Sequence, residues 1–203
     1  MNEMTDIELV RVRRRFLDII KSFFIEEPDA ERLSRWRGII TALARERINP
    51  LMDNAVRKLN SLLSDMKFDE IKDEYYELFI NPFSEYQTKM TLSYYMNGHD
   101  LGQSLVNFRG FLMEADLVKK DAVDESEDSL VFMLDVLATL IKEENESPEK
   151  IRVKESELVS GYLDPFTVHL SRAMKENEKA RFYEACTMFL AGYVDLEKGL
   201  IAP

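Results

Sequence analysis

Carboxylates at helical spacing are the residues of this sequence whose type and pattern could support chemistry. Two acidic helices could in principle converge on Mg²⁺, which prefers oxygen ligands, and hydrolyse a nucleoside triphosphate as all-helical pyrophosphatases do. A solvated helix face explains the first group better, because it lies mostly opposite an apolar stripe that begins at Phe68. The carboxylates are Asp69, Glu70, Asp73, Glu74 and Glu77, followed later by Glu125, Glu127 and Asp128.

The rest of the catalytic inventory is small. The two histidines, His99 and His169, are seventy residues apart, and neither belongs to a zinc or di-iron ligand pattern. We expect His99 to be exposed in a turn and His169 to be partly buried. The sequence has no glycine-rich phosphate loop and no nucleophile elbow. We therefore predict no catalytic residue, no metal site and no cofactor.

Cysteine usage indicates a reducing compartment. Cys186 is the one cysteine, so an intrachain disulfide is impossible. Its neighbours Phe182, Phe189 and Leu190 predict a thiol that is buried as a small hydrophobic group. This pattern suits the cytoplasm.

The charge of the chain is unevenly distributed. Residues 1–66 carry 12 basic and 11 acidic side chains, whereas residues 67–203 carry 15 and 27, and the net charge is −11. Such a surface repels nucleic acid and anionic lipid and favours cationic partners. No run of 18 apolar residues is present, so we predict no membrane insertion.

One short motif resembles an export signal. Arg13-Arg14-Arg15-Phe16-Leu17 matches the Arg-Arg-x-Phe-Leu core of a twin-arginine leader. Such a leader continues with an uncharged apolar run, and here Asp18, Lys21, Glu26 and Glu27 interrupt it. The spacing of the apolar residues predicts an amphipathic first helix instead.

Apolar residues recur at intervals of three and four along most of the chain, and Gly and Pro are few, with 7 and 6 residues. We predict an all-α fold, a single-domain helical bundle of about eight to ten helices over residues 1–203. The last helix has the clearest pattern, from Phe182 to Leu200. Pro28 is expected in the first turn of the second helix, which Asn49-Pro50 ends, and a later helix stops before Asn81-Pro82.

Several connections can also be placed from the sequence. Residues 80–101 are the least regular part, and they hold two aromatic clusters before a turn at Asn97-Gly98. Asp124 and Glu127 resemble a capping box for a helix that starts near Leu130. Residues 149–176 are expected to form one or two helices, broken around Gly161 or Asp164-Pro165.

The stretch Tyr75-Tyr76-Glu77-Leu78-Phe79-Ile80-Asn81-Pro82 resembles the aromatic-x-x-Leu-Phe-x-Gly-Pro motif of the TorD/DmsD/NarJ family. Further matches follow in family order over residues 67–200. Ala122-Val123-Asp124-Glu125 stands where the family has a Glu-Pro-Asp-His loop, so only the Asp is kept, and Asn81 replaces the Gly. The other matching residues are Ser93, Tyr95, Leu105, Phe108, Phe111, Ala115-Asp116-Leu117, Leu130-Val131-Phe132-Met133, Tyr162-Leu163, Phe166 and Phe182-Tyr183.

The resemblance implies a TorD-like fold and a cytoplasmic chaperone for a molybdenum-cofactor enzyme. The implied partner is the precursor of that redox enzyme, bound through its twin-arginine leader or in its apo-form before cofactor insertion, by a monomer or a homodimer. A leader offers two guanidinium groups and an apolar stretch, and its receptor needs carboxylates beside an apolar groove. The candidate peptide-binding residues are Tyr75, Leu78, Phe79, Pro82, Ser93, Tyr94, Tyr95, Asp124 and Glu125.

Other interpretations remain open at this point. Tyr75, Leu78 and Phe79 could be ordinary core residues, and Asp124 could serve only as a helix cap. Tyr94 and Tyr95 favour a surface role, because adjacent residues on an irregular segment are rarely both buried. The chain could also be a different helical interaction or assembly factor, or the Mg²⁺-dependent pyrophosphatase considered above.

Overall fold

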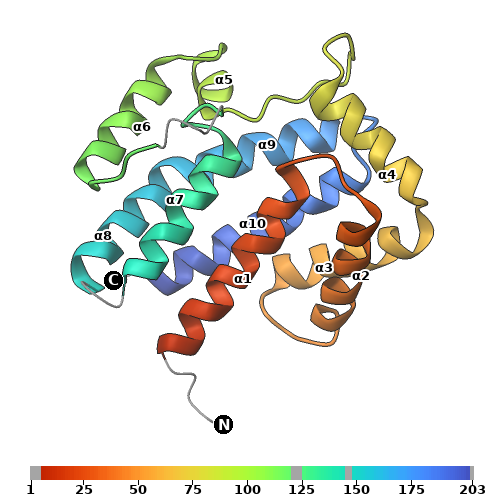
Figure 1. Ribbon diagram of the computed structural model, residues 1–203, viewed down its shortest axis with the longest axis horizontal. Helices are drawn as coiled ribbons and strands as arrows, with labels where there is room; N and C mark the ends of the chain where they lie inside the picture. The colour runs from red at the N-terminus through yellow and green to blue at the C-terminus, as the bar shows by residue number, and fades with distance from the viewer. Residues whose placement is uncertain (1–5, 120–124, 145–147, 202–203) are drawn as a thin grey trace. The chain divides into compact units, whose positions relative to one another are not determined.

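The computed structural model describes residues 6–119, 125–144 and 148–201, and in these residues it is built from α-helices, with one isolated β-bridge (Figure 1). The predicted all-α fold is confirmed. The chain divides into two compact units. The first unit contains residues 1–21, 90–166 and 198–203, and the second contains residues 22–89 and 167–197. The single domain over residues 1–203 stays a prediction.

The second unit contains helices that begin at side-chain caps. Asp29 precedes α2 (Ala30–Leu43) and accepts a hydrogen bond from the Arg32 N–H at 2.7 Å. Pro28 therefore lies before the helix rather than in its first turn. Asn49 caps α3 (Pro50–Asp65) through the Met52 N–H, so Asn49-Pro50 starts this helix, whereas α2 has already ended.

An aromatic cluster forms the core of the second unit. Phe23, near the end of α1 (Asp6–Phe24), packs edge-on against Trp36 at a ring distance of 5.0 Å. Trp36 stacks in turn on Phe182, which starts α10 (Phe182–Ile201). These rings are fully buried, and the Trp36 Nε1–H donates to the Ser22 hydroxyl, so the indole N–H keeps a partner in the core. The last helix is confirmed where its pattern predicted it.

Two helices of the second unit approach closely at a glycine. A Cβ atom placed on Gly192 of α10 would lie 2.7 Å from the backbone nitrogen of Met52 in α3. The Asn49 side-chain amide also donates to the Gly192 carbonyl at 3.0 Å. Asn49 therefore caps one helix and holds it against the other.

The remaining elements of the second unit are α4 (Phe68–Tyr75), the π-helical segment η1 (Tyr76–Ile80) and, from Thr167, most of α9 (Asp164–Glu176). The helix formed by α4 and η1 stops before Asn81-Pro82, as predicted. Its last turn is π-helical, and the Asn81 N–H donates to the Tyr76 carbonyl at 2.8 Å.

The first unit is built around a strongly apolar helix, α7 (Leu130–Glu143), eight of whose residues are buried. Its N-cap is Ser129, whose hydroxyl accepts from the Phe132 N–H. The predicted capping box of Asp124 and Glu127 is therefore not the cap of this helix, and Asp124 lies outside the described residues. The unit also contains most of α1, together with α5 (Leu92–Asn97), α6 (Gln103–Glu114) and α8 (Pro148–Leu158).

Residues 92–97 are more regular than expected, because they form α5 within the segment predicted to be irregular. The turn after it is confirmed, since Gly98 takes a φ of +80°, which suits glycine. Helix α8 runs into α9 through the π-helical segment η2 (Val159–Leu163), so the expected break at Gly161 is a local widening of the helix.

A buried ion-pair network uses part of the twin-arginine-like motif. Arg13 is buried on α1, and its guanidinium contacts Glu155 at 3.0 Å and Glu144 at 2.7 Å. Phe16 and Leu17 are buried as well. The predicted amphipathic first helix is confirmed. Among the described helices, none combines the length and the apolar character that crossing a bilayer requires.

Candidate peptide-binding site

The candidate peptide-binding residues fall into two groups, one in each unit. Tyr75, Leu78, Phe79 and Pro82 belong to the second unit, and the remaining candidates from Ser93 onward belong to the first. Each group is described by itself below.

In the second unit, the helix formed by α4 and η1 buries one face and exposes the other. Tyr75 and Leu78 are buried, so the core-packing interpretation describes both side chains. Phe79 is half-buried and packs edge-on against Tyr183 at 5.2 Å. The Tyr75 hydroxyl donates to the Phe24 carbonyl. A role for these residues in peptide contact stays a prediction.

The outer face of the same helix and the loop after it are apolar and exposed. Tyr76 and Ile80 are about half exposed, Pro82 is exposed, and Phe83 is 93% exposed. A side chain as large as Phe83 that is held almost entirely in solvent is unusual for a residue without a partner. This exposed surface, Tyr76, Ile80, Pro82 and Phe83, is called the Phe83 face below.

Hydrogen bonds hold the loop that carries Phe83. The Thr88 N–H donates to the Leu78 carbonyl at 2.8 Å, and the Asn177 side-chain amide donates to the Tyr86 carbonyl at 2.7 Å. Lys179 lies over the Tyr86 ring at 5.5 Å. These contacts hold the loop at both ends. Binding a partner would therefore cost less backbone conformational entropy than ordering a free loop would.

The acidic residues of α4 take two different roles. Asp69, Glu70 and Asp73 are exposed, as the solvated-face interpretation predicted. Glu74 is the exception, because it is buried, and its carboxylate accepts hydrogen bonds from the N–H groups of Phe182 and Tyr183 at the start of α10. Burial raises the Glu74 pKa to about 7, although those two hydrogen bonds lower it.

In the first unit, α5 carries three candidates with different environments. Ser93 is fully buried. Tyr94 is 39% exposed, and Tyr95 is half-buried against Phe166 at a ring distance of 5.7 Å. The expectation that the two tyrosines are not both buried is confirmed, although they lie on a helix. Desolvation raises the pKa of the Tyr95 hydroxyl well above its usual range.

Asp128 is a buried carboxylate that the sequence suggested only as a possible Mg²⁺ ligand and not as part of the peptide-binding site. Its side chain accepts from the Ser93 N–H at 2.8 Å and from the Ser126 hydroxyl at 2.6 Å, and its carbonyl accepts from the Leu92 N–H. A β-bridge joins Thr91 and Ser129 beside it. Asp128 therefore ties the loop before α7 to the start of α5. The signal in the sequence was the short Ser126-x-Asp128-Ser129 pattern, which is typical of side chains that bond to local backbone.

The candidate loop is described only from Glu125 onward, and Asp124 falls outside the described residues. Glu125 is exposed and accepts from the Ser129 hydroxyl at 3.1 Å. Partial desolvation raises the pKa of Glu125, against that hydrogen bond. The loop from Glu125 to Ser129 contacts the start of α5 through Asp128, whose side chain bonds to Ser93, and a shared role for Glu125 and Tyr94 stays a prediction.

Helices α5 and α6 and the residues that follow each of them carry apolar side chains that are between 39% and 90% exposed. Glu127, paired with Arg109, contributes a carboxylate nearby in the chain. We call this the Tyr94 face, and its exposed apolar residues are Tyr94, Met96, Leu101, Val106, Met113 and Val118.

The ionisable residues of the described regions do not gather into a group of three or more His, Cys, Asp or Glu side chains that could hold a metal ion. His99 is exposed and His169 is half-buried, as expected. Cys186 is buried, which raises the pKa of its thiol well above the usual value. We find no arrangement in the described residues that suggests acid–base or nucleophilic catalysis.

The comparisons with known proteins agree with this fold. A crystal structure described as that of a candidate redox enzyme maturation protein from Archaeoglobus fulgidus aligns with a TM-score of 0.55. The two share 13% sequence identity, and the alignment covers 87% of this chain and 91% of that chain. A search of curated proteins gives no significant match.

The family model described as nitrate reductase delta subunit matches residues 46–174, which is more than half of the chain. This range includes the aromatic motif at Tyr75, helix α5 and the loop of Asp128. The predicted relationship to the TorD/DmsD/NarJ proteins is thereby confirmed. The chain belongs to the nitrate reductase delta subunit family of redox-enzyme maturation chaperones.

Proposed function

We propose that this protein is a cytoplasmic chaperone that binds the precursor of a molybdenum-cofactor redox enzyme, through its twin-arginine leader or another part of its apo-form, until the cofactor is inserted. The observation that carries the proposal is the family match over residues 46–174. The structure adds two surfaces whose chemistry suits such a client.

The Tyr94 face of the first unit suits the apolar stretch of a leader. It presents exposed aromatic, aliphatic and methionine side chains, and thioether side chains adapt to varied apolar partners. Glu125 and Glu127 lie in the loop tied to α5 through Asp128. Carboxylates at that position suit guanidinium groups, which pair with them in a bidentate manner.

The Phe83 face of the second unit offers the same combination. Phe83 and Ile80 supply apolar contact area, while Glu77 and Glu85 lie beside them in the chain and Asp73 occupies the exposed face of α4. Rigid aromatic side chains in partly desolvated positions supply much of the binding energy in peptide and protein interfaces. Both faces are therefore candidates for client contact.

A calorimetric titration tests the proposal. The probe is a synthetic peptide with two adjacent arginines followed by an uncharged apolar stretch, as in a twin-arginine leader. We expect a dissociation constant below about 100 μM. A peptide with Lys-Lys in place of Arg-Arg should bind more weakly, because an ammonium group lacks the bidentate fork. Raised salt should weaken binding as well.

Variants then locate the contact. Phe83→Ala and Tyr94→Ala each remove an exposed ring and should leave the fold intact. Leu51→Ala is the matched control, because Leu51 is about half exposed on α3, away from both faces in the sequence. Binding that falls with Phe83→Ala or Tyr94→Ala, and not with the control, supports the corresponding face. If leader peptides from several molybdoenzymes all fail to bind, leader recognition is wrong.

A general assembly factor without a leader-bearing client is an alternative function, since the same exposed apolar residues could serve it. Native purification followed by identification of the bound protein separates the two. A redox enzyme whose leader has been deleted should no longer co-purify if the leader is the binding element. Continued co-purification would favour recognition of the folded apo-enzyme.

A further inference from the structure

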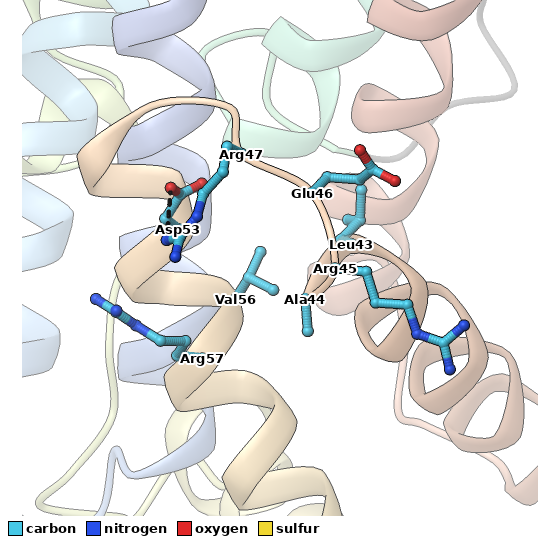
Figure 2. Close-up of a pocket in the computed structure, with 8 residues that line it drawn as sticks. All are labelled: Leu43, Ala44, Arg45, Glu46, Arg47, Asp53, Val56 and Arg57. Atoms are coloured by element: carbon cyan, nitrogen blue, oxygen red, sulfur yellow. Dashed lines mark hydrogen bonds and ion pairs between the residues drawn. The ribbon is translucent and has the colours of Figure 1, made fainter.

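The second unit contains a small hollow of about 160 Å³ between the end of α2 and the start of α3. Apolar and charged side chains line it together, and three of them are arginines in a chain whose net charge is −11 (Figure 2). Neither face of the proposed client site includes it. The lining residues are Leu43, Ala44, Arg45, Glu46, Arg47, Asp53, Val56 and Arg57.

The arginines of this hollow differ in their pairing. Arg47 contacts Asp53 at 3.4 Å, and Asp53 also accepts from the Ile48 N–H, so these charges are engaged with each other. Arg45 and Arg57 are exposed, and among the described residues neither guanidinium pairs with a carboxylate. Two positive charges are therefore available to a ligand at this site.

Figure 2 shows Val56 and Ala44 between the two available arginines, with Arg57 extending to one side and Arg45 to the other. A single compact anion would not meet both guanidinium groups in this arrangement. An extended ligand would meet both, if it carried carboxylates on either side of an apolar residue. The volume suits that residue, because a cavity of about 150 Å³ holds a benzene ring.

We propose that this hollow, the arginine hollow, docks an acidic segment of a partner protein, with one apolar side chain over Val56 and Ala44 and carboxylates paired to Arg45 and Arg57. Charge complementarity supports this occupant, because Arg45 and Arg57 outnumber Glu46, the exposed carboxylate of the same lining. Residues 1–66 carry a net charge of +1 and residues 67–203 a net charge of −12, so the arginine hollow lies in the less acidic part of the chain. Its ligand is opposite in charge to the twin-arginine leader, and the inference does not rest on leader binding.

A fluorescence-anisotropy titration tests the arginine hollow, with a labelled, end-capped peptide that contains Glu-Glu-Leu-Glu-Glu. We expect saturable binding that weakens at least tenfold in Arg45→Gln/Arg57→Gln. Replacing the glutamates by glutamines, or the leucine by serine, should weaken binding as well. The control variant Arg14→Gln/Arg15→Gln changes the net charge by the same amount at two exposed positions on α1, and it should bind as the wild type does. Thermal melts establish that both variants are folded.

Three results would overturn the inference. The peptide could fail to bind, or it could lose affinity equally in both double variants, which would mean general charge attraction. Inorganic phosphate at low millimolar concentration could displace the peptide completely at constant ionic strength, which would mean a small-anion site. Self-association of the protein that Arg45→Gln/Arg57→Gln abolishes, without peptide binding, would assign the arginine hollow to a second copy of the chain.

Discussion

The carboxylate of Glu74 on α4 accepts a hydrogen bond of 2.8 Å from the backbone N–H of Tyr183, in the first turn of α10. A second bond comes from the Phe182 N–H at 3.1 Å. The first N–H groups of a helix have no partner within the helix, and they carry partial positive charge. Glu74 therefore caps a helix that lies more than a hundred residues later in the chain, and it does so from inside the core.

This relationship predicts a pH dependence of stability. Burial raises the Glu74 pKa from 4.5 to about 7, so the folded state holds a proton that the unfolded state releases between these pH values. The contribution of Glu74 to the free energy of unfolding should fall as pH rises from about 4.5 to about 7, by roughly 3 kcal/mol in total. Above that range it should be constant.

Denaturant unfolding at several pH values checks this prediction, with Glu74→Gln as the comparison. Glutamine does not titrate, so the difference in unfolding free energy between wild type and variant isolates the carboxyl group. The difference should change with pH in favour of the wild type on the acid side. A difference that is constant from pH 4 to 8 would show that the carboxyl group has an ordinary pKa.

Asp128 should be needed for the order of the loop beside α5. Asp128→Ala leaves the Ser93 N–H and the Ser126 hydroxyl without their acceptor, and an unpaired buried donor such as the Ser93 N–H costs about 1–3 kcal/mol. Hydrogen exchange should accelerate at Ser93 and at the neighbouring Leu92. Exposed Asp69, changed to Ala, is the control, and it should leave hydrogen exchange at Ser93 and Leu92 unchanged. Unaltered exchange at Ser93 in Asp128→Ala would show that the Asp128 side chain does not hold this loop to the start of α5.

Gly192 should tolerate no side chain. Gly192→Ala places a methyl group 2.7 Å from the Met52 nitrogen, which forces α3 and α10 apart and should lower the free energy of unfolding by about 1–3 kcal/mol. Gly38→Ala is the control, because that glycine is exposed within α2 with open space around its Cβ position. It should raise stability by about 0.5–1 kcal/mol. Thermal melts of the two variants should therefore shift in opposite directions.

The buried pair of Arg13 and Glu155 should show strong coupling. Arg13→Met leaves the Glu155 carboxylate buried without this partner, and such a loss destabilises a fold by about 3–5 kcal/mol. Arg13→Met/Glu155→Met removes both charges and should recover most of that loss. A double-mutant cycle by urea unfolding measures the coupling. Additive effects would mean that the two charges do not stabilise each other.

The sequence by itself determined the helical class and most helix positions. Apolar residues at intervals of three and four can be buried only on one face of a helix, so the stripe from Phe182 to Leu200 predicted α10 without any tertiary information. Local signals also identified the turn at Gly98 and the end of the helix before Asn81. The order of short motifs around Tyr75 was sufficient to indicate the family.

Tertiary structure decided which polar residues became internal. Glu74 and the exposed Asp73 are adjacent carboxylates on α4. Only the position of α10 makes Glu74 a buried cap and leaves Asp73 in solvent. Arg13 is likewise one of three consecutive arginines, and the placement of Glu155 in the first unit selects it. Pairing between residues more than a hundred positions apart depends on how helices pack. Helical periodicity in the sequence does not predict that packing.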